Sequence, residues 1–198
     1  TGYVAGLTTK TNNIGFVVGM TNETMNQFGY GYYAGAKDAN PDITVQQFNA
    51  NSFADSATGK TMANTAITNG ADIVFQAAGA TGLGVIEACQ EAGVYAIGVD
   101  SDQSSIAPNT VLTSAMKRVD NAVYNAVEEL IDGTLEGGIQ SFDLAAGGVD
   151  IAPSQDLIAP EVIDAVNEVK EKIVSGEIEV PADKESFEAK YGDVYQLD

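Results

Sequence analysis

Histidine is absent from this sequence, and cysteine occurs only once, as Cys89. Without histidine the chain has no Ser-His-Asp triad, no histidine general base and no histidine-ligated metal. A single thiol forms no intrachain disulfide, so cysteine usage does not indicate a cellular compartment. Cys89 falls on the apolar side of a predicted helix, and we interpret it as a small buried hydrophobic residue rather than a nucleophile.

Positive charge is scarce, since nine lysine and arginine residues stand against 28 aspartates and glutamates, for a formal net charge of −19. This balance argues against binding to a nucleic-acid backbone or to an anionic membrane surface. The sequence also lacks an apolar run long enough to span a membrane. Its 198 residues suffice for one ordinary domain or two small ones with a real core.

No signal peptide or lipobox is visible in the sequence. The first residues, TGYVAGLTTK, are apolar and typical of the inside of a domain. We therefore expect the sequence to begin within a domain, and the lack of a targeting segment carries little information.

The most informative stretch is residues 70–103, GADIVFQAAGATGLGVIEACQEAGVYAIGVDSDQ. A short apolar run with β-branched residues predicts a strand at 72–77, and a glycine-rich turn follows it. Apolar residues then recur at helical spacing up to Gly93, and a second strand is predicted at 94–99. Such a βαβ unit implies a parallel sheet that binds ligands at the carboxyl ends of its strands.

The rest of the chain repeats this alternation of strands and helices. Three strand–helix pairs followed by a fourth strand predict an α/β fold with a doubly wound parallel sheet. Asp55 or Ser56 is expected to cap the second helix of this series. The other predicted elements are a helix at 2–9, strands at 14–18, 43–48, 110–113 and 139–144, an amphipathic helix carrying Val119, Val123, Val127 and Leu130 and closed by Gly133, and a helix from Pro160 to Gly176.

Four strand ends converge in this fold, at residues 20–22, 51–53, 79–81 and 100–102. Phe53 lies in a polar loop, where it either packs beside the following helix or offers a flat platform to an aromatic ring. Lys117 and Arg118 are the only adjacent basic pair. They either form surface ion pairs or donate hydrogen bonds to a ligand hydroxyl or phosphate.

The glycine turn also permits a dinucleotide-binding interpretation. Gly79, Gly82 and Gly84 follow a strand, Asp100 stands at the end of the next one, and Tyr33-x-x-x-Lys37 is typical of some dehydrogenases. However, the glycine turn does not follow the first strand, and its spacing is GxxGxG rather than GxGxxG. The sequence therefore disfavours an NAD-binding oxidoreductase.

Several stretches, in this order and spacing, resemble the basic membrane protein family: NPDITV, SFADSATGK, GADIVFQAAGATGLGVIEA, AIGVDSDQ and VLTSAMKRVDNAVY. Its members are extracytoplasmic substrate-binding lipoproteins of ABC importers with a type I periplasmic-binding-protein fold, and many bind purine nucleosides. The resemblance covers about residues 1–181. It implies no enzyme activity, no cofactor and no metal, a nucleoside-like ligand, a transporter permease as partner, and a lipid anchor on an upstream cysteine not present in this chain.

The resemblance also implies how the chain is divided. Family members carry a further N-terminal segment that forms most of one lobe. We expect residues 1–100 and 145–180 to form a complete C-terminal lobe, 101–144 to be a hinge crossing and a remnant of the N-terminal lobe, and 181–198 to be a loose helix or acidic tail. With that lobe absent, apolar surface along the 115–132 helix is expected to be exposed, which favours self-association or weak ligand binding.

The family's binding residues match four positions of this sequence. Phe53 corresponds to the aromatic residue that stacks on the base, and Gly79 to the glycine whose backbone faces the sugar. Asp100 corresponds to the carboxylate that accepts from the ribose hydroxyls, and Lys117 to the lysine that donates to the ribose. Two neighbouring hydroxyls can donate to one carboxylate in charge-assisted bonds, with the lysine balancing its charge.

Two further ligand-binding candidates are Asp102, which is expected to act behind Asp100, and Met20, at the end of the first strand. An alternative function on the same fold is a sensory or regulatory ligand-binding domain.

Overall fold

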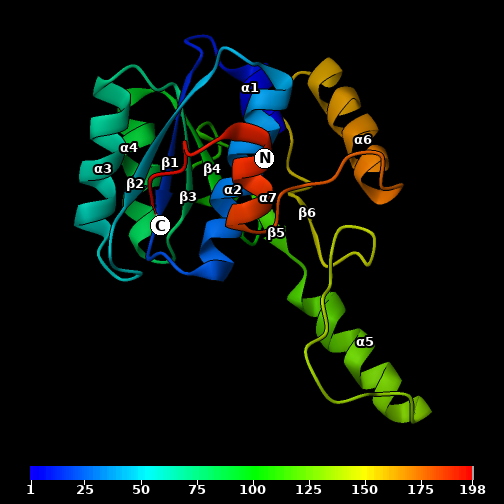
Figure 1. Ribbon diagram of the computed structural model, residues 1–198. Coiled ribbons are helices and arrows are strands. Elements are labelled where there is room, and N and C mark those ends of the chain that lie inside the picture. Colours follow the sequence, from blue (N-terminus) through cyan, green and yellow to red (C-terminus); the bar gives the residue numbers. More distant parts are fainter. Residues whose placement is uncertain (198) are drawn as a thin grey trace.

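A computed structural model gives the structure of residues 1–197, in which six strands form one sheet in the order β2-β1-β3-β4-β5-β6 (Figure 1). The elements in chain order are α1 (Gly2–Thr8), β1 (Asn13–Val18), α2 (Glu23–Ala39), β2 (Thr44–Asn49), α3 (Ser56–Thr68), β3 (Ile73–Ala77), α4 (Thr81–Ala92), β4 (Tyr95–Asp100), the 3₁₀ helix η1 (Ser104–Ile106), β5 (Val111–Lys117), α5 (Val119–Asp132), β6 (Val149–Ile151), α6 (Pro160–Val174) and α7 (Lys184–Tyr191).

The sheet winds in two directions from its centre, which confirms the predicted doubly wound architecture. β1 to β5 are parallel, and the chain moves outward from β1 to β2 before it returns to β3, β4 and β5 on the other side. Val18 lies opposite both Asn49 and Ala77, so the first three strands end at the same level. Ligands of such sheets bind where the winding reverses, at the carboxyl ends of the strands.

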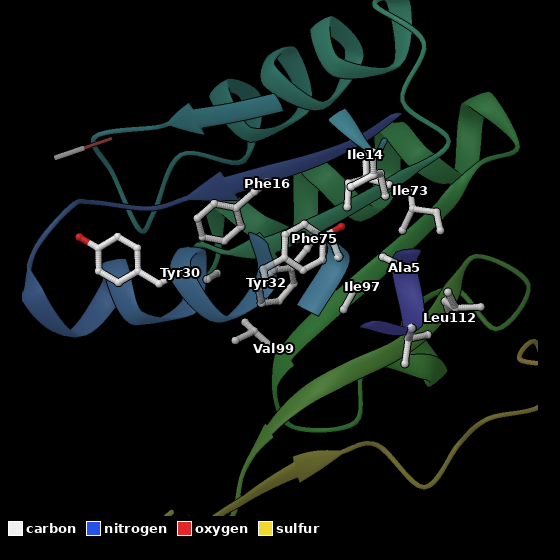
Figure 2. Close-up of a cluster of buried hydrophobic side chains, with 14 of the residues drawn as sticks. Ala5, Ile14, Phe16, Tyr30, Tyr32, Ile73, Phe75, Ile97, Val99 and Leu112 are labelled. Carbon is white, nitrogen blue, oxygen red and sulfur yellow. The ribbon is translucent and has the colours of Figure 1, made fainter. Parts of the chain in front are cut away.

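Helices cover both faces of the sheet, with α3 and α4 on one side and α1 and α2 on the other (Figure 1). Alternate strand residues point to opposite faces. Phe16 and Phe75 therefore join Tyr32 of α2 in an aromatic core, with ring centroids 5.4 Å apart for the two phenylalanines and 5.0 Å apart for Phe75 and Tyr32 (Figure 2). The other face packs smaller side chains, among them Cys89.

The helix ends follow the signals in the sequence. The Asp55 carboxylate caps α3 by accepting a hydrogen bond from the Thr58 backbone N–H at 3.0 Å. Gly93 and Gly133 end α4 and α5 in the left-handed conformation that glycine favours. Cys89 is fully buried, and this burial raises the pKa of its thiol to about 12, so the interpretation as a small hydrophobic residue is confirmed.

The main layer extends beyond residue 100, after which the sequence predicts the hinge crossing. Residues 104–117 do not leave the main layer after β4, because β5 pairs with β4 along the sheet and buries residues 111–114. The chain leaves this layer at Arg118, whose backbone N–H donates to the carbonyl of Gly148 at 2.8 Å. We call residues 119–147 the arm. It consists of α5 and the segment after it, extends away from the sheet (Figure 1), and contains no buried residue.

The strand predicted at 139–144 is wrong as well. These residues lie in the arm, have no strand assignment, and include the fully exposed Ile139. An apolar run forms a strand only where a neighbouring strand satisfies its backbone groups, and none of the described strands reaches the arm.

The C-terminal segment after Pro181 is not loose. Asp183 caps α7 through a capping box with Ser186, and Phe187 is fully buried. The Phe187 ring stacks on Tyr30 of α2 at a centroid distance of 4.9 Å. The sequence prediction failed here because charged residues surround Phe187 in the sequence. Composition alone does not show that one face of α7 packs against the core.

Candidate functional site

The loops that follow the parallel strands meet at one edge of the sheet, as the sequence predicts. We call this the carboxyl edge. Met20 follows β1 and is exposed, Phe53 lies in the loop after β2, and Gly79 lies in the turn after β3. Asp100 and Lys117 end the adjacent strands β4 and β5.

The Phe53 ring rests on the backbone at the end of β1. A Cβ atom at Gly19 would clash with this ring, and a Cβ atom at Gly79 would lie 3.1 Å from the Phe53 carbonyl oxygen. Gly79 also has a φ of +58°, which a side chain would strain. Phe53 remains 38% exposed, so the two glycines let the ring approach closely while part of it stays open to a ligand.

Thr81 holds the loop that carries Phe53, and sequence reasoning did not identify it. Its buried hydroxyl donates to the Ser52 carbonyl at 2.9 Å and accepts from the Asp55 N–H at 2.9 Å. Its backbone N–H donates to the Phe53 carbonyl at 3.2 Å. The available signal was a threonine in the first turn of a helix that follows a glycine turn.

Asp100 and Lys117 form an ion pair at the carboxyl edge, with 3.1 Å between the Asp100 Oδ1 and the Lys117 Nζ atoms. The side chains are 56% and 44% exposed, so the pair contributes little to stability and stays accessible. The Lys117 Nζ also lies 5.1 Å from the centroid of the Phe28 ring, a cation–π distance.

Asp100 has an unusual backbone. Its φ is +67°, and the N–H of Ser101 donates to the carbonyl of Val99 at 2.8 Å. This three-residue γ-turn with positive φ is rare and strained for a residue with a side chain. Strain of this kind, on the order of 1–3 kcal/mol, concentrates at functional sites. It supports a functional role for the Asp100 carboxylate, because no packing requirement explains a half-exposed aspartate there.

Asp102 is engaged within the protein. It accepts a hydrogen bond from the Ser104 N–H at 3.0 Å. Burial alone would raise its pKa, but hydrogen bonds from Ser154 and Ser104 outweigh this effect and hold the pKa below its ordinary value. These contacts favour a supporting role for Asp102 in the loop after β4.

Arg118, the second member of the predicted basic pair, turns away from Asp100. Its guanidinium pairs with Asp120 at 2.8 Å. The surface ion pair is therefore the interpretation that fits Arg118, while Lys117 reaches the carboxyl edge.

The remaining glycines of the turn after β3 serve internal packing. A Cβ atom at Gly82 would clash with the Gln76 side chain, and one at Gly84 would clash with the Ser56 carbonyl. Tyr33 packs edge-on against Phe187 and Tyr191, at centroid distances of 5.3 and 5.6 Å. Gly82, Gly84 and Tyr33, three of the residues that suggested a dinucleotide site, thus have structural roles.

Two properties of the described residues bear on other kinds of site. Among residues 1–197, no three histidine, cysteine, aspartate or glutamate side chains come together as a metal-binding group. No helix in the same range is both long and apolar enough to cross a membrane.

The fold is that of ABC transporter solute-binding proteins. The structure of such a protein from Aeropyrum pernix K1 aligns with a TM-score of 0.77 at 25% identity, over 95% of this chain and 66% of that one. A transcriptional activator of the comK gene from Bacillus halodurans shares the fold with a TM-score of 0.81 at 21% identity, over 89% of this chain and 61% of that one.

The chain belongs to the Bmp family, described as ABC transporter substrate-binding protein PnrA-like, whose pattern matches residues 1–184. It is similar to basic membrane protein D of Borreliella burgdorferi, with 39% identity over 193 residues, 94% of this chain and 57% of the relative. A CD4+ T-cell-stimulating antigen of Listeria monocytogenes is 37% identical over 197 residues, covering 91% of this chain and 55% of the relative. The chain thus spans little more than half the length of these relatives.

Proposed function

We propose that this chain forms one side of the ligand site of an extracytoplasmic solute-binding protein that serves an ABC importer. The proposed ligand is a purine nucleoside or a similar ribosylated molecule. The observation that carries the proposal is the accessible Asp100–Lys117 pair at the same sheet edge as the partly open Phe53 ring. Membership of the Bmp family supports the class of protein.

Each side chain has a task that suits a nucleoside. The Asp100 carboxylate can accept hydrogen bonds from two neighbouring ribose hydroxyls, and the Lys117 ammonium balances the charge and donates a further bond. The open part of the Phe53 ring offers a stacking surface to the base. Gly79 keeps side-chain bulk away from the sugar, and the exposed Met20 adds an adaptable apolar contact beside it.

The proposed role is binding without catalysis. The description of the matching family as ABC transporter substrate-binding proteins supports this role. The ligand would be enclosed between two lobes, delivered to a permease, and the protein held at the outer face of the cell membrane by a lipid. The longer relatives support two lobes, since this chain covers little more than half of their length.

The test is calorimetric titration, with inosine as the probe, of the full-length protein that carries both proposed lobes. We expect Phe53→Ala and Asp100→Ala each to weaken binding by about tenfold or more, the loss of one stacked ring or one charge-assisted hydrogen bond. The matched controls are Leu83→Ala, which removes another exposed apolar side chain, and Glu87→Ala, which removes a carboxylate that pairs with Lys60 at 2.9 Å. Both controls should bind inosine as the parent protein does.

Two outcomes would contradict the proposal. Equal affinity in the two site variants and the two controls would reject the assigned residues. A parent protein that binds no nucleoside, in a titration extended to adenosine and guanosine, would reject the ligand class.

A further inference from the structure

We propose that Gln76 and Gln103 form an amide pair that positions the Asp100 carboxylate. The consequence for binding rests on the function proposed above, whereas the consequence for the shape of the loop does not. Gln76 is fully buried at the end of β3. Its Nε2 donates to Gln103 Oε1 at 2.8 Å, and its Oε1 accepts from the N–H of Ala78 at 3.1 Å.

Gln103 forms hydrogen bonds that fix the backbone on both sides of the γ-turn at Asp100. Its side-chain oxygen accepts a second hydrogen bond from the N–H of Val99, at 3.0 Å, and Val99 immediately precedes Asp100. Its backbone N–H donates to the hydroxyl of Ser114 on β5 at 3.1 Å. The backbone before the turn, at Val99, is thus bonded to the Gln103 amide. The backbone after the turn, at Gln103, is bonded to the neighbouring strand β5.

The surrounding backbone leaves room for this pair. A Cβ atom at Gly82 would clash with the Gln76 amide, and a Cβ atom at Gly98 would clash with Gln103 and with the Ser114 hydroxyl. The glycines thus make space on two elements, α4 and β4, for two polar side chains. This arrangement explains Gly82, one of the glycines for which the sequence permitted a dinucleotide-binding interpretation.

The chemistry requires an amide at Gln103. One carbonyl oxygen accepts from two donors, the Gln76 NH₂ group and the Val99 N–H. An apolar side chain of the same size would leave both donors without this acceptor, and a buried donor without a partner destabilises the folded state. Asp100 lies within the segment that the pair holds, and its positive φ is strained. Without the amide, we expect the turn to relax to a negative φ and the carboxylate to move away from Lys117.

The first experiment needs no ligand. The one-bond Cα–Hα coupling of Asp100, measured by NMR, distinguishes a positive from a negative φ. We expect the parent protein to show the positive-φ value and Gln103→Met to lose it. Gln90→Met, which changes an exposed glutamine on α4, should retain it. An unchanged positive φ in Gln103→Met would overturn the proposal. Should Gln103→Met not fold, Gln103→Ala, which removes the same amide without adding an apolar side chain of equal size, gives the same test.

The second experiment is a double-mutant cycle for inosine binding with Gln103→Met and Asp100→Ala. A positioning residue that acts through Asp100 should lower affinity by about fivefold when Asp100 is present and have no effect when it is absent. A merely structural role predicts the same loss in both backgrounds, and that result would overturn the proposal. If the parent protein binds no nucleoside, the proposed function fails, and the coupling measurement alone decides on the amide pair.

Discussion

The helices α5 and α6 carry similar apolar stripes but lie in opposite environments. In α6, Val162 and Val166 are buried in the core around the sheet. In α5, the valines at positions 119, 123 and 127 are 62%, 58% and 50% exposed, although they recur at the same helical spacing. The pattern of a sequence therefore predicts that a helix forms and which face is apolar, but burial also requires a partner surface.

The same contrast separates the sheet from the arm. The sheet has helices on both faces, and its central strands are almost entirely buried. The arm, which starts two residues after Lys117, exposes the apolar stripe of α5 and the segment behind it. In the proposed division into lobes, the carboxyl edge belongs to one lobe and α5 packs on the other. The ligand site then lies where the two meet.

The largest expected effect comes from the same substitution made in both regions. Leu112→Ala on β5 removes a buried side chain from the core and should lower the free energy of unfolding by about 2–5 kcal/mol. In protein dilute enough to be monomeric, Leu130→Ala on α5 removes a side chain that is 65% exposed and should change it by less than about 0.5 kcal/mol. Urea denaturation followed by circular dichroism measures both.

If Leu130→Ala lowers the free energy of unfolding as much as Leu112→Ala does, the contrast between the sheet and the arm is wrong. It would show that the apolar face of α5 is covered in solution. The two variants are chemically identical changes, so the difference between them reports mainly burial, with a smaller contribution from the different preferences of alanine for helix and strand.

Most of the fold could be predicted from the sequence, because its elements depend on local signals. The glycine ends of α4 and α5, the Asp55 cap and the strand–helix alternation are all readable in short windows, and each was confirmed. The predictions that failed depend on distant partners. The 139–144 run has no strand beside it, β5 extends the sheet, and α7 is packed through Phe187.

The candidate site divides in the same way. Asp100, Lys117 and Phe53 could be proposed from the sequence, because they lie at or near strand ends and match the binding positions of the family that the sequence resembles. Thr81 and Gln76 could not, since their roles arise from contacts with residues far away in the sequence. Thr81 binds the loop 29 residues before it, and Gln76 binds a side chain 27 residues after it.

A second prediction concerns self-association through the exposed face of α5. We expect the chain to self-associate, because this face offers apolar surface that water disfavours. Replacing Val123 and Val127 together by serine should weaken association by about tenfold or more, since each valine contributes on the order of 1 kcal/mol when buried. Sedimentation equilibrium measures the dissociation constant.

The control for this prediction is Val174→Ser, which changes an exposed valine at the end of α6 and should leave association unchanged. A chain that stays monomeric at every concentration would contradict the prediction. An equal effect of the control would show that association uses a surface other than α5.

The smallest expected effect concerns Asp100 and distinguishes its proposed role in ligand binding from its effect on folding stability. Asp100→Gly and Asp100→Ala both remove the carboxylate and its ion pair with Lys117, but only glycine adopts a φ of +67° without strain. We therefore expect the glycine variant to be more stable than the alanine variant by about 1 kcal/mol. At Asp102, which lacks a positive φ, the order should reverse, because glycine there only adds freedom to the unfolded chain. Thermal and urea unfolding of the four variants measure this.

Equal stability of the two Asp100 variants would mean that the turn relaxes freely, and the strain argument for a functional aspartate would then fail. The expected result would mean that this position is occupied by aspartate although glycine suits the backbone better, which supports the proposed role of the Asp100 carboxylate in ligand binding.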